Sequence, residues 1–180
     1  MRKLSNEAYT PSYVIDPIRE FFGGIDFDPF SCIRANHTIK AKNYCSYEFS
    51  AYLDVFEYLW VESKTIFANP EYSTKELTKA LDKLFQHLEG KEVFLLLNSD
   101  TATVNYQRCL RRCDALLLFD KRIPFERPYS LPYSCPELFA PYAYKPNQNN
   151  SAQTGFYFGD RAIEFKKELS HLGHIIINFC

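Results

Sequence analysis

Two kinds of hydrophobic pattern alternate along this chain. Short continuous apolar runs are typical of strands buried on both faces, whereas apolar residues at every third or fourth position are typical of helices. The strand-like runs are KTIFA (64–68), EVFLLLN (92–98), ALLLF (115–119), GFYFG (155–159) and HIIINF (174–179). Helix-like stripes occur at 14–22, 77–88, 106–112 and 160–173. This alternation predicts an α/β fold with a mostly parallel sheet.

Several local signals mark where these elements begin and end. Gly23-Gly24 is expected to stop the first helix, and Ser73 with Glu76 forms a capping-box pattern for the helix that Gly90 ends. The run VFEYLWV (55–61) fits a strand or a helical turn. We expect one domain over residues 1–180, with a long irregular segment at 126–154 that is rich in proline.

Polar side chains gather where three of the predicted strands end. They are Asp26, Asp28 and Ser31 after a first short strand, Asn69 and Tyr72 after the second, and Ser99 and Asp100 after the third. The carboxyl ends of parallel strands share one edge of a sheet, and ligands bind beyond that edge. The sequence therefore predicts an active site there.

The segment Asn69-Pro70-Glu71-Tyr72 has the groups needed to hold an exocyclic amine of a nucleic-acid base. The side-chain carbonyl of Asn69 and the backbone carbonyl of Pro70 can accept hydrogen bonds from both N–H groups, which makes the nitrogen more nucleophilic. Tyr72 can stack on a base that has been flipped out of the duplex. The same residues also fit an ordinary strand-ending turn, because Asn-Pro is common in turns.

Composition narrows the function classes. The 21 Lys and Arg residues are balanced by 22 Asp and Glu, which excludes a strongly basic nucleic-acid coat protein. The six cysteines and four histidines form no zinc-ligand spacing, so we expect free thiols and no metal. The first ten residues lack an apolar core, and no run is long enough to span a membrane, which indicates a cytoplasmic protein.

Taken in order, several short pieces resemble the phage-type DNA N6-adenine methyltransferase family, the compact Dam-like enzymes. The pieces are YTP (9–11), IDFDPFSC (25–32) with Asn36, KNYCS (42–46), FANPEY (67–72), LLLNSDT (95–101), KRIPF (121–125) and GFYFG (155–159). They span nearly the whole chain. The resemblance implies a Rossmann-like fold with helices on both faces of the sheet, S-adenosylmethionine as methyl donor and adenine in double-stranded DNA as acceptor.

Transferred to this sequence, the resemblance implies particular roles. Tyr9, Thr10 and Pro11 would border the cofactor, and Asp28, Pro29 and Ser31 would bind it. Asn69, Pro70 and Tyr72 would hold the target base, and Lys121, Arg122 and Arg127 would meet DNA. A phage enzyme of this kind would act in the host cytoplasm and protect DNA from restriction. No acid for the cofactor ribose stands out, although Glu48 and Asp54 are candidates.

One departure from the family pattern keeps alternatives open. Glu71 stands where the family has proline, which loosens the loop and adds negative charge near incoming phosphates. An active adenine methyltransferase and a catalytically impaired relative that binds DNA or protein therefore both remain hypotheses. The same Asn-Pro-x-Tyr chemistry also serves RNA and protein amides.

Overall fold

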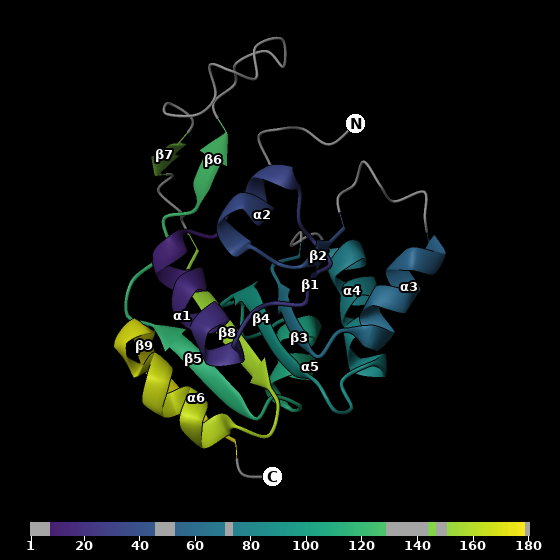
Figure 1. The fold of residues 1–180 in the computed structure, drawn as a ribbon. Coiled ribbons are helices and arrows are strands. Elements are labelled where there is room, and N and C mark those ends of the chain that lie inside the picture. Colours follow the sequence, from purple (N-terminus) through teal and green to yellow (C-terminus); the bar gives the residue numbers. More distant parts are fainter. Residues whose placement is uncertain (1–7, 46–52, 71–73, 129–143, 147–150, 179–180) are drawn as a thin grey trace.

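The computed structural model describes residues 8–45, 53–70, 74–128, 144–146 and 151–178. Within these ranges the backbone forms a seven-stranded sheet and a separate two-stranded ribbon, with helices packed on the sheet (Figure 1). The helices are α1 (Ser12–Phe22), α2 (Ile33–Ile39), α3 (Leu53–Glu62), α4 (Thr74–Gln86), α5 (Val104–Leu110) and α6 (Ala162–Leu169). The strands are β1 (Phe27–Asp28), β2 (Asn43–Tyr44), β3 (Thr65–Ala68), β4 (Glu92–Asn98), β5 (Ala115–Phe119), β6 (Glu126–Pro128), β7 (Tyr144–Pro146), β8 (Gln153–Phe158) and β9 (Gly173–Ile177).

The large sheet is mixed, with the strand order β2-β1-β3-β4-β8-β5-β9. The strands β2, β1, β3 and β4 pair in parallel, whereas β8 is antiparallel to both β4 and β5, and β9 is antiparallel to β5. The α/β class is confirmed, but the expectation of a mostly parallel sheet holds only for the first half. In the second half, β8 lies between β4 and β5, which run in the same direction and are connected through α5. Strand β9 follows β8 through α6 and pairs with the other side of β5.

Both faces of the sheet are buried. Along β4, Phe94 and Leu96 face one apolar core with α1, α2 and α6, whereas Val93, Leu95 and Leu97 face a second core with α3, α4 and α5. Successive side chains of a strand point to opposite faces, so a run of five buried apolar residues supplies both cores at once. Figure 1 shows α1 and α6 on one side of the sheet.

Helix α1 buries the apolar residues that the sequence pattern at 14–22 predicted, and it is capped by Gly23. Its buried side chains include Val14, Ile18 and Phe21. Gly23 adopts a left-handed conformation, with a φ of 70°, and its N–H and that of Gly24 reach back to the last turn. Pro17 lies in the middle of α1 rather than in the first turn, so the helix tolerates the loss of one backbone hydrogen bond.

Other elements differ from the sequence expectations in their bounds. The ambiguous run 55–61 lies in helix α3, and the first strand is reduced to the two residues of β1. Helix α4 ends at Gln86, four residues before Gly90, and the predicted cap at Ser73 lies outside the described residues. The segment 126–154 is not irregular throughout, because β6 pairs with β7 and β8 begins at residue 153.

A charged cluster joins four elements at the amino end of β4. The Tyr157 hydroxyl donates to Glu92 Oε1 at 2.6 Å, and Arg161 Nε donates to the same oxygen at 2.8 Å. Arg161 also donates to the Phe21 carbonyl at 3.1 Å and lies over the Phe21 ring. Burial and the hydrogen bond to Glu92 raise the pKa of Tyr157. The cluster fixes the end of α1 to β4, β8 and the start of α6.

Gly155 provides a test of how tightly the sheet packs. A Cβ at this position would lie 2.4 Å from Cζ of Phe94, which is itself buried. We expect Gly155→Ala to lower the free energy of unfolding by roughly 1–3 kcal/mol, because the Phe94 ring must leave its place. Urea unfolding measures the change.

A double-mutant cycle with Phe94→Leu serves as the control. The smaller side chain opens space at the point of contact, so Gly155→Ala should cost less in the Phe94→Leu background than in the wild type. Equal costs in the two backgrounds would show that the close approach between Phe94 and Gly155 is not what limits the packing.

Candidate active site

Three of the predicted polar positions meet at one edge of the sheet. The register of the parallel strands places Phe27 beside Ile66 and Ala68 beside Leu95, so β1, β3 and β4 end on the same side. Asp28 is the last residue of β1, Asn69 follows β3, and Ser99 follows β4. The sequence prediction that these groups share a carboxyl edge is confirmed.

Asp28 is a carboxyl removed from water. Its exposed fraction is 1%, and its Oδ1 accepts a hydrogen bond from the backbone N–H of Phe30 at 3.0 Å. Burial raises the pKa of Asp28 to about 7, even though hydrogen bonds from Phe30 and Ser31 favour the charged form. Burial and the nearby charge of Asp28 also raise the pKa of the Cys45 thiol to about 11. A cation brought to this carboxyl would stabilise its charged form.

The loop after β1 is fastened to β2. The backbone N–H of Ser31 donates to the Cys45 carbonyl, and the N–H of Cys45 donates to the Asp28 carbonyl, both at 3.0 Å. Pro29 and Ser31 are buried in this loop. The three predicted cofactor residues of this segment are therefore held together in a fixed turn.

The N-terminal segment 9–11 reaches the same edge. Tyr9 forms two backbone hydrogen bonds with Glu126, at 2.8 and 3.0 Å, and Tyr9, Thr10 and Pro11 are all buried. The side chain of Asn69 donates from Nδ2 to Thr10 Oγ1 at 3.3 Å. This bond joins two predicted site segments that lie 59 residues apart in the sequence.

The loop that follows Asn69 is described only in part. Asn69 is half-buried, and Pro70 is buried. Glu71 and Tyr72 lie outside the described residues. The hydrogen bond to Thr10 uses the amide nitrogen of Asn69 rather than its carbonyl oxygen.

The sequence did not indicate a polar network beside Asn98. Gln153 is buried, donates to Asn98 Oδ1 at 3.1 Å, and accepts from the backbone N–H of Ile123 at 3.4 Å. On the other face, the Thr154 hydroxyl lies 2.8 Å from that of Ser99 and 3.0 Å from that of Tyr106. The sequence prediction placed Gln153 in the irregular segment 126–154. Its position directly before the apolar run of β8 was the available signal.

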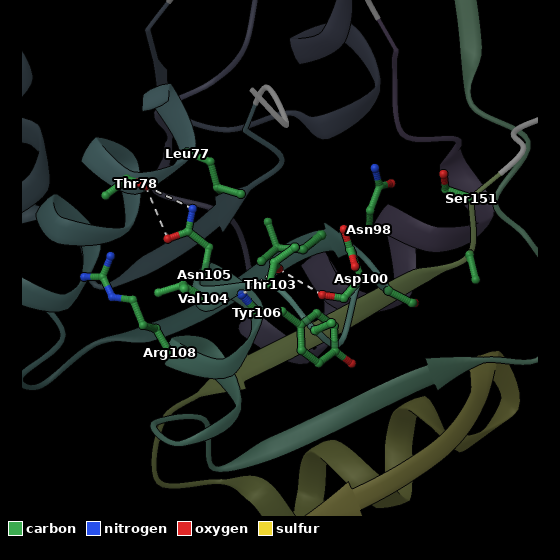
Figure 2. Close-up of a pocket in the computed structure, with 14 residues that line it drawn as sticks. Leu77, Thr78, Asn98, Asp100, Thr103, Val104, Asn105, Tyr106, Arg108 and Ser151 are labelled. Carbon is green, nitrogen blue, oxygen red and sulfur yellow. Dashed lines mark hydrogen bonds between the residues drawn. The ribbon is translucent and has the colours of Figure 1, made fainter. Parts of the chain in front are cut away.

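A hollow of about 750 Å³ opens next to this network, between α4 and α5 (Figure 2). One wall is Leu77 and Thr78 of α4, and the floor is the chain that follows β4, from Asn98 to Asp100. Asn105 and Thr78 are hydrogen-bonded across the two helices, with Asn105 Nδ2 donating at 3.1 Å. The hollow thus adjoins the carboxyl edge and is reached from the α4–α5 side.

Comparison with known proteins decides the family. A family model described as DNA N-6-adenine-methyltransferase (Dam) matches residues 3–160. The chain belongs to the Dam family. No curated protein and no solved structure gave a match. Membership in the Dam family implies a DNA adenine methyltransferase, with DNA as the substrate.

The predicted DNA-contacting residues of this Dam chain lie along the segment after β5. Lys121 and Arg122 are exposed, and Ile123 beside them is buried. Arg127 belongs to β6, and its side chain lies outside the described residues, as do Glu48 and the side chain of Asp54. Lys121 and Arg122 follow β5, which β4 and β8 separate from β3 and Asn69 in the strand order.

Other features of the Dam chain concern cysteine, metals and membranes. Cys32, Cys45, Cys109 and Cys113 form no disulfide, and Cys135 and Cys180 lie outside the described residues. In the part of the chain that is described, no three His, Cys, Asp or Glu side chains gather as metal ligands. None of the described helices is long and apolar enough to cross a membrane.

The buried carboxyl of Asp28 gives a pH-dependent stability. Its pKa is about 7 in the folded protein against 3.8 as the ordinary value, so folding favours the protonated form. Stability from this group is complete below pH 3.8 and is lost as the pH rises through about 7. We expect Asp28→Asn to raise the free energy of unfolding by roughly 1–4 kcal/mol at pH 8 and by little at pH 4. Urea unfolding at both pH values measures this.

Asp26 is the matched control, because folding lowers the pKa of Asp26 whereas it raises that of Asp28. It is partly buried, which raises its pKa, but hydrogen bonds from Lys42 and from the backbone N–H groups of Lys64 and Thr65 outweigh burial and lower it. Asp26→Asn should therefore destabilise the protein above pH 3.8, with a loss that fades as the pH falls. A gain in stability from Asp26→Asn, or none from Asp28→Asn at pH 8, would contradict this assignment.

Proposed function

We propose that this protein transfers a methyl group from S-adenosylmethionine to the exocyclic N6 amine of adenine in double-stranded DNA. The observation that carries the proposal is the hydrogen bond between Asn69 and Thr10 at the carboxyl edge. It brings the segment expected to hold the base into contact with the segment expected to border the cofactor. Transfer requires these two ligands side by side.

The residues at the edge fit S-adenosylmethionine. Asp28 is a buried carboxyl at the end of β1 with a raised pKa, and a cationic ligand would favour its charged form. Asp28, Pro29 and Ser31 would hold the cofactor, with Tyr9, Thr10 and Pro11 at its border. When bound, S-adenosylmethionine supplies an electrophilic methyl group on a positively charged sulfur. The parallel half, β2-β1-β3-β4, would be the Rossmann-like part of the sheet that carries this site.

Asn69 and Pro70 would act on the target base. The carbonyl oxygen of the Asn69 amide, which is not the atom bonded to Thr10, would accept a hydrogen bond from the adenine amine. The backbone carbonyl of Pro70 would accept the second, and Tyr72 would stack on the flipped base. Two acceptors at the amine draw its lone pair away from the ring, and they stabilise the positive charge that develops on nitrogen.

The wider role follows from the same proposal. The exposed Lys121 and Arg122, with Arg127 nearby in sequence, would meet phosphates of the duplex. A phage-encoded enzyme of this kind would work in the host cytoplasm and mask DNA from restriction. The single domain of residues 1–180 would contain both the cofactor site and the base site.

The test is transfer of tritiated methyl from S-adenosylmethionine to unmethylated DNA. We expect incorporation by the wild type and a loss of roughly 100-fold or more in Asn69→Ala, because a preplaced acceptor at the reacting atom is removed. Calorimetry should show that Asn69→Ala still binds S-adenosylmethionine. RNA and protein extracts assayed in parallel identify the acceptor.

Asn178→Ala is the control for loss of stability. Asn178 donates to the Leu110 and Cys113 carbonyls, on the opposite edge of the sheet from Asn69. Its replacement should weaken the fold but leave methyl transfer per folded molecule unchanged. Equal loss of transfer in both variants would argue against a role for Asn69 in the reaction.

Glu71 favours a second candidate, a catalytically impaired relative that binds DNA or protein. It replaces the proline that the family has in this loop. A wild type that binds S-adenosylmethionine but transfers no methyl to any acceptor would support this candidate. Glu71→Pro is then the variant in which transfer should return.

A further inference from the structure

The hollow between α4 and α5 belongs to none of the roles assigned above. Its α4 wall, Leu77 and Thr78, lies in the helix that follows Asn69 and Pro70 in the chain. Its floor follows β4, the strand that pairs with β3. A ligand in the hollow would therefore lie on the β4 side of Asn69, away from Asp28 in the strand order. Its volume of about 750 Å³ is in the range of pockets that enclose small organic ligands.

The lining of the hollow matches the chemistry of a nucleotide. Gln153 donates to the Oδ1 of Asn98, so the Nδ2 of Asn98 is the end that can donate to a ligand. Asp100 adds a carboxylate, and Leu77 and Val104 add apolar surface (Figure 2). The Thr103 hydroxyl caps α5, where it donates to the Asp100 carbonyl and accepts from the N–H of Tyr106. Bases present both donors and acceptors on their edges and apolar faces above and below the ring. A mixed lining of this kind suits a base better than it suits a purely apolar or purely anionic ligand.

The two helices that frame the hollow carry most of the local positive charge. The whole chain has 21 basic and 22 acidic residues, whereas α4, α5 and the two residues after α5 have six basic residues against two acidic ones. Arg108 lines the hollow and pairs with Asp82 at 2.5 Å. Arg108 and Arg112 both lie over the Phe85 ring, at 5.3 and 4.7 Å from its centre. This basic excess is complementary to a phosphate backbone.

We propose that the hollow holds a nucleotide that neighbours the target adenine, while α4 and α5 follow the phosphates of the same DNA strand. The proposal rests on the proposed function for the identity of the target. It assigns a second DNA-contacting surface, separate from Lys121 and Arg122. Arg108 of α5, with Arg111 and Arg112 after it, would also fit a solvated helix face, but the hollow lined by Arg108 gives this face a ligand-sized opening.

Val104 offers a test that should leave the fold intact. It stands in the first turn of α5, lines the hollow and is 76% exposed. We expect Val104→Glu to weaken binding of labelled, unmethylated duplex DNA by roughly tenfold at low salt, because it places a negative charge among the phosphates. Val104→Lys should keep or increase the affinity and steepen its dependence on salt. Fluorescence anisotropy measures both.

Ile163 provides the matched control. It is also a β-branched residue in the first turn of a helix, α6, and it is 72% exposed. Ile163→Glu and Ile163→Lys change the net charge by the same amounts but should leave DNA affinity unchanged. Calorimetry with S-adenosylmethionine should give the same affinity in all four variants as in the wild type.

The outcomes separate this proposal from the proposed function. Equal DNA affinity for Val104→Glu and Ile163→Glu, or no DNA binding by the wild type, would overturn it. Loss of S-adenosylmethionine binding in Val104→Glu would also overturn it, since the hollow would then belong to the cofactor. A wild type that binds DNA through Val104 but transfers no methyl would refute only the proposed methyl transfer, and the hollow would stand as a DNA site.

Discussion

The central strand β4 needs hydrogen-bond partners for its backbone on both sides, while its side chains contribute to two hydrophobic cores. It pairs in parallel with β3 and antiparallel with β8, and its apolar side chains alternate between the two faces. A buried strand without either neighbour would leave unpaired N–H and C=O groups, at a cost of several kcal/mol. The parallel side of the sheet continues from β3 to β1 and β2. The other side continues through β8, which runs opposite to both of its neighbours, β4 and β5.

This arrangement explains why the candidate site residues lie at one edge of the sheet. In the parallel half, every strand that ends there releases its chain into a loop, so Asp28, Asn69 and the residues after Asn98 emerge side by side. In the antiparallel half, β8 begins at that edge instead, and Gln153 enters it from the other direction to support Asn98. The opposite edge holds the Glu92–Arg161–Tyr157 cluster, whose charges are satisfied by one another. The amino edge of the sheet therefore carries charged groups that pair with one another. The carboxyl edge carries Asp28, a buried carboxyl whose pKa is raised.

Sequence reasoning worked where a single physical signal dominated. The run 92–98 became β4 with the expected bounds because it is apolar from Val93 to Leu97, and Asp28, Asn69 and Ser99 lie at one edge because parallel strands share their carboxyl ends. Asp26, expected in the same cluster as Asp28, instead precedes β1 and is hydrogen-bonded to Lys42 and to the start of β3. It failed where the structure depends on contacts between segments that are distant in the sequence. The direction of β8 depends on which neighbours it joins, and the run 155–159 has the same appearance in either direction. Gln153 was taken for a loop residue because its role depends on Asn98 and Ile123, which are distant in sequence.

The contact of Tyr9 with Glu126 has a consequence for how this protein matures in the cell. Tyr9 emerges from the ribosome early, but its backbone partner is made 117 residues later, and Thr10 meets Asn69 only across 59 residues. Contacts of such long sequence separation form late, because the closure entropy of the intervening chain opposes them. The contact that holds the segment 9–11 in place therefore cannot form until residue 126 has been made. A chain truncated before that residue would lack it.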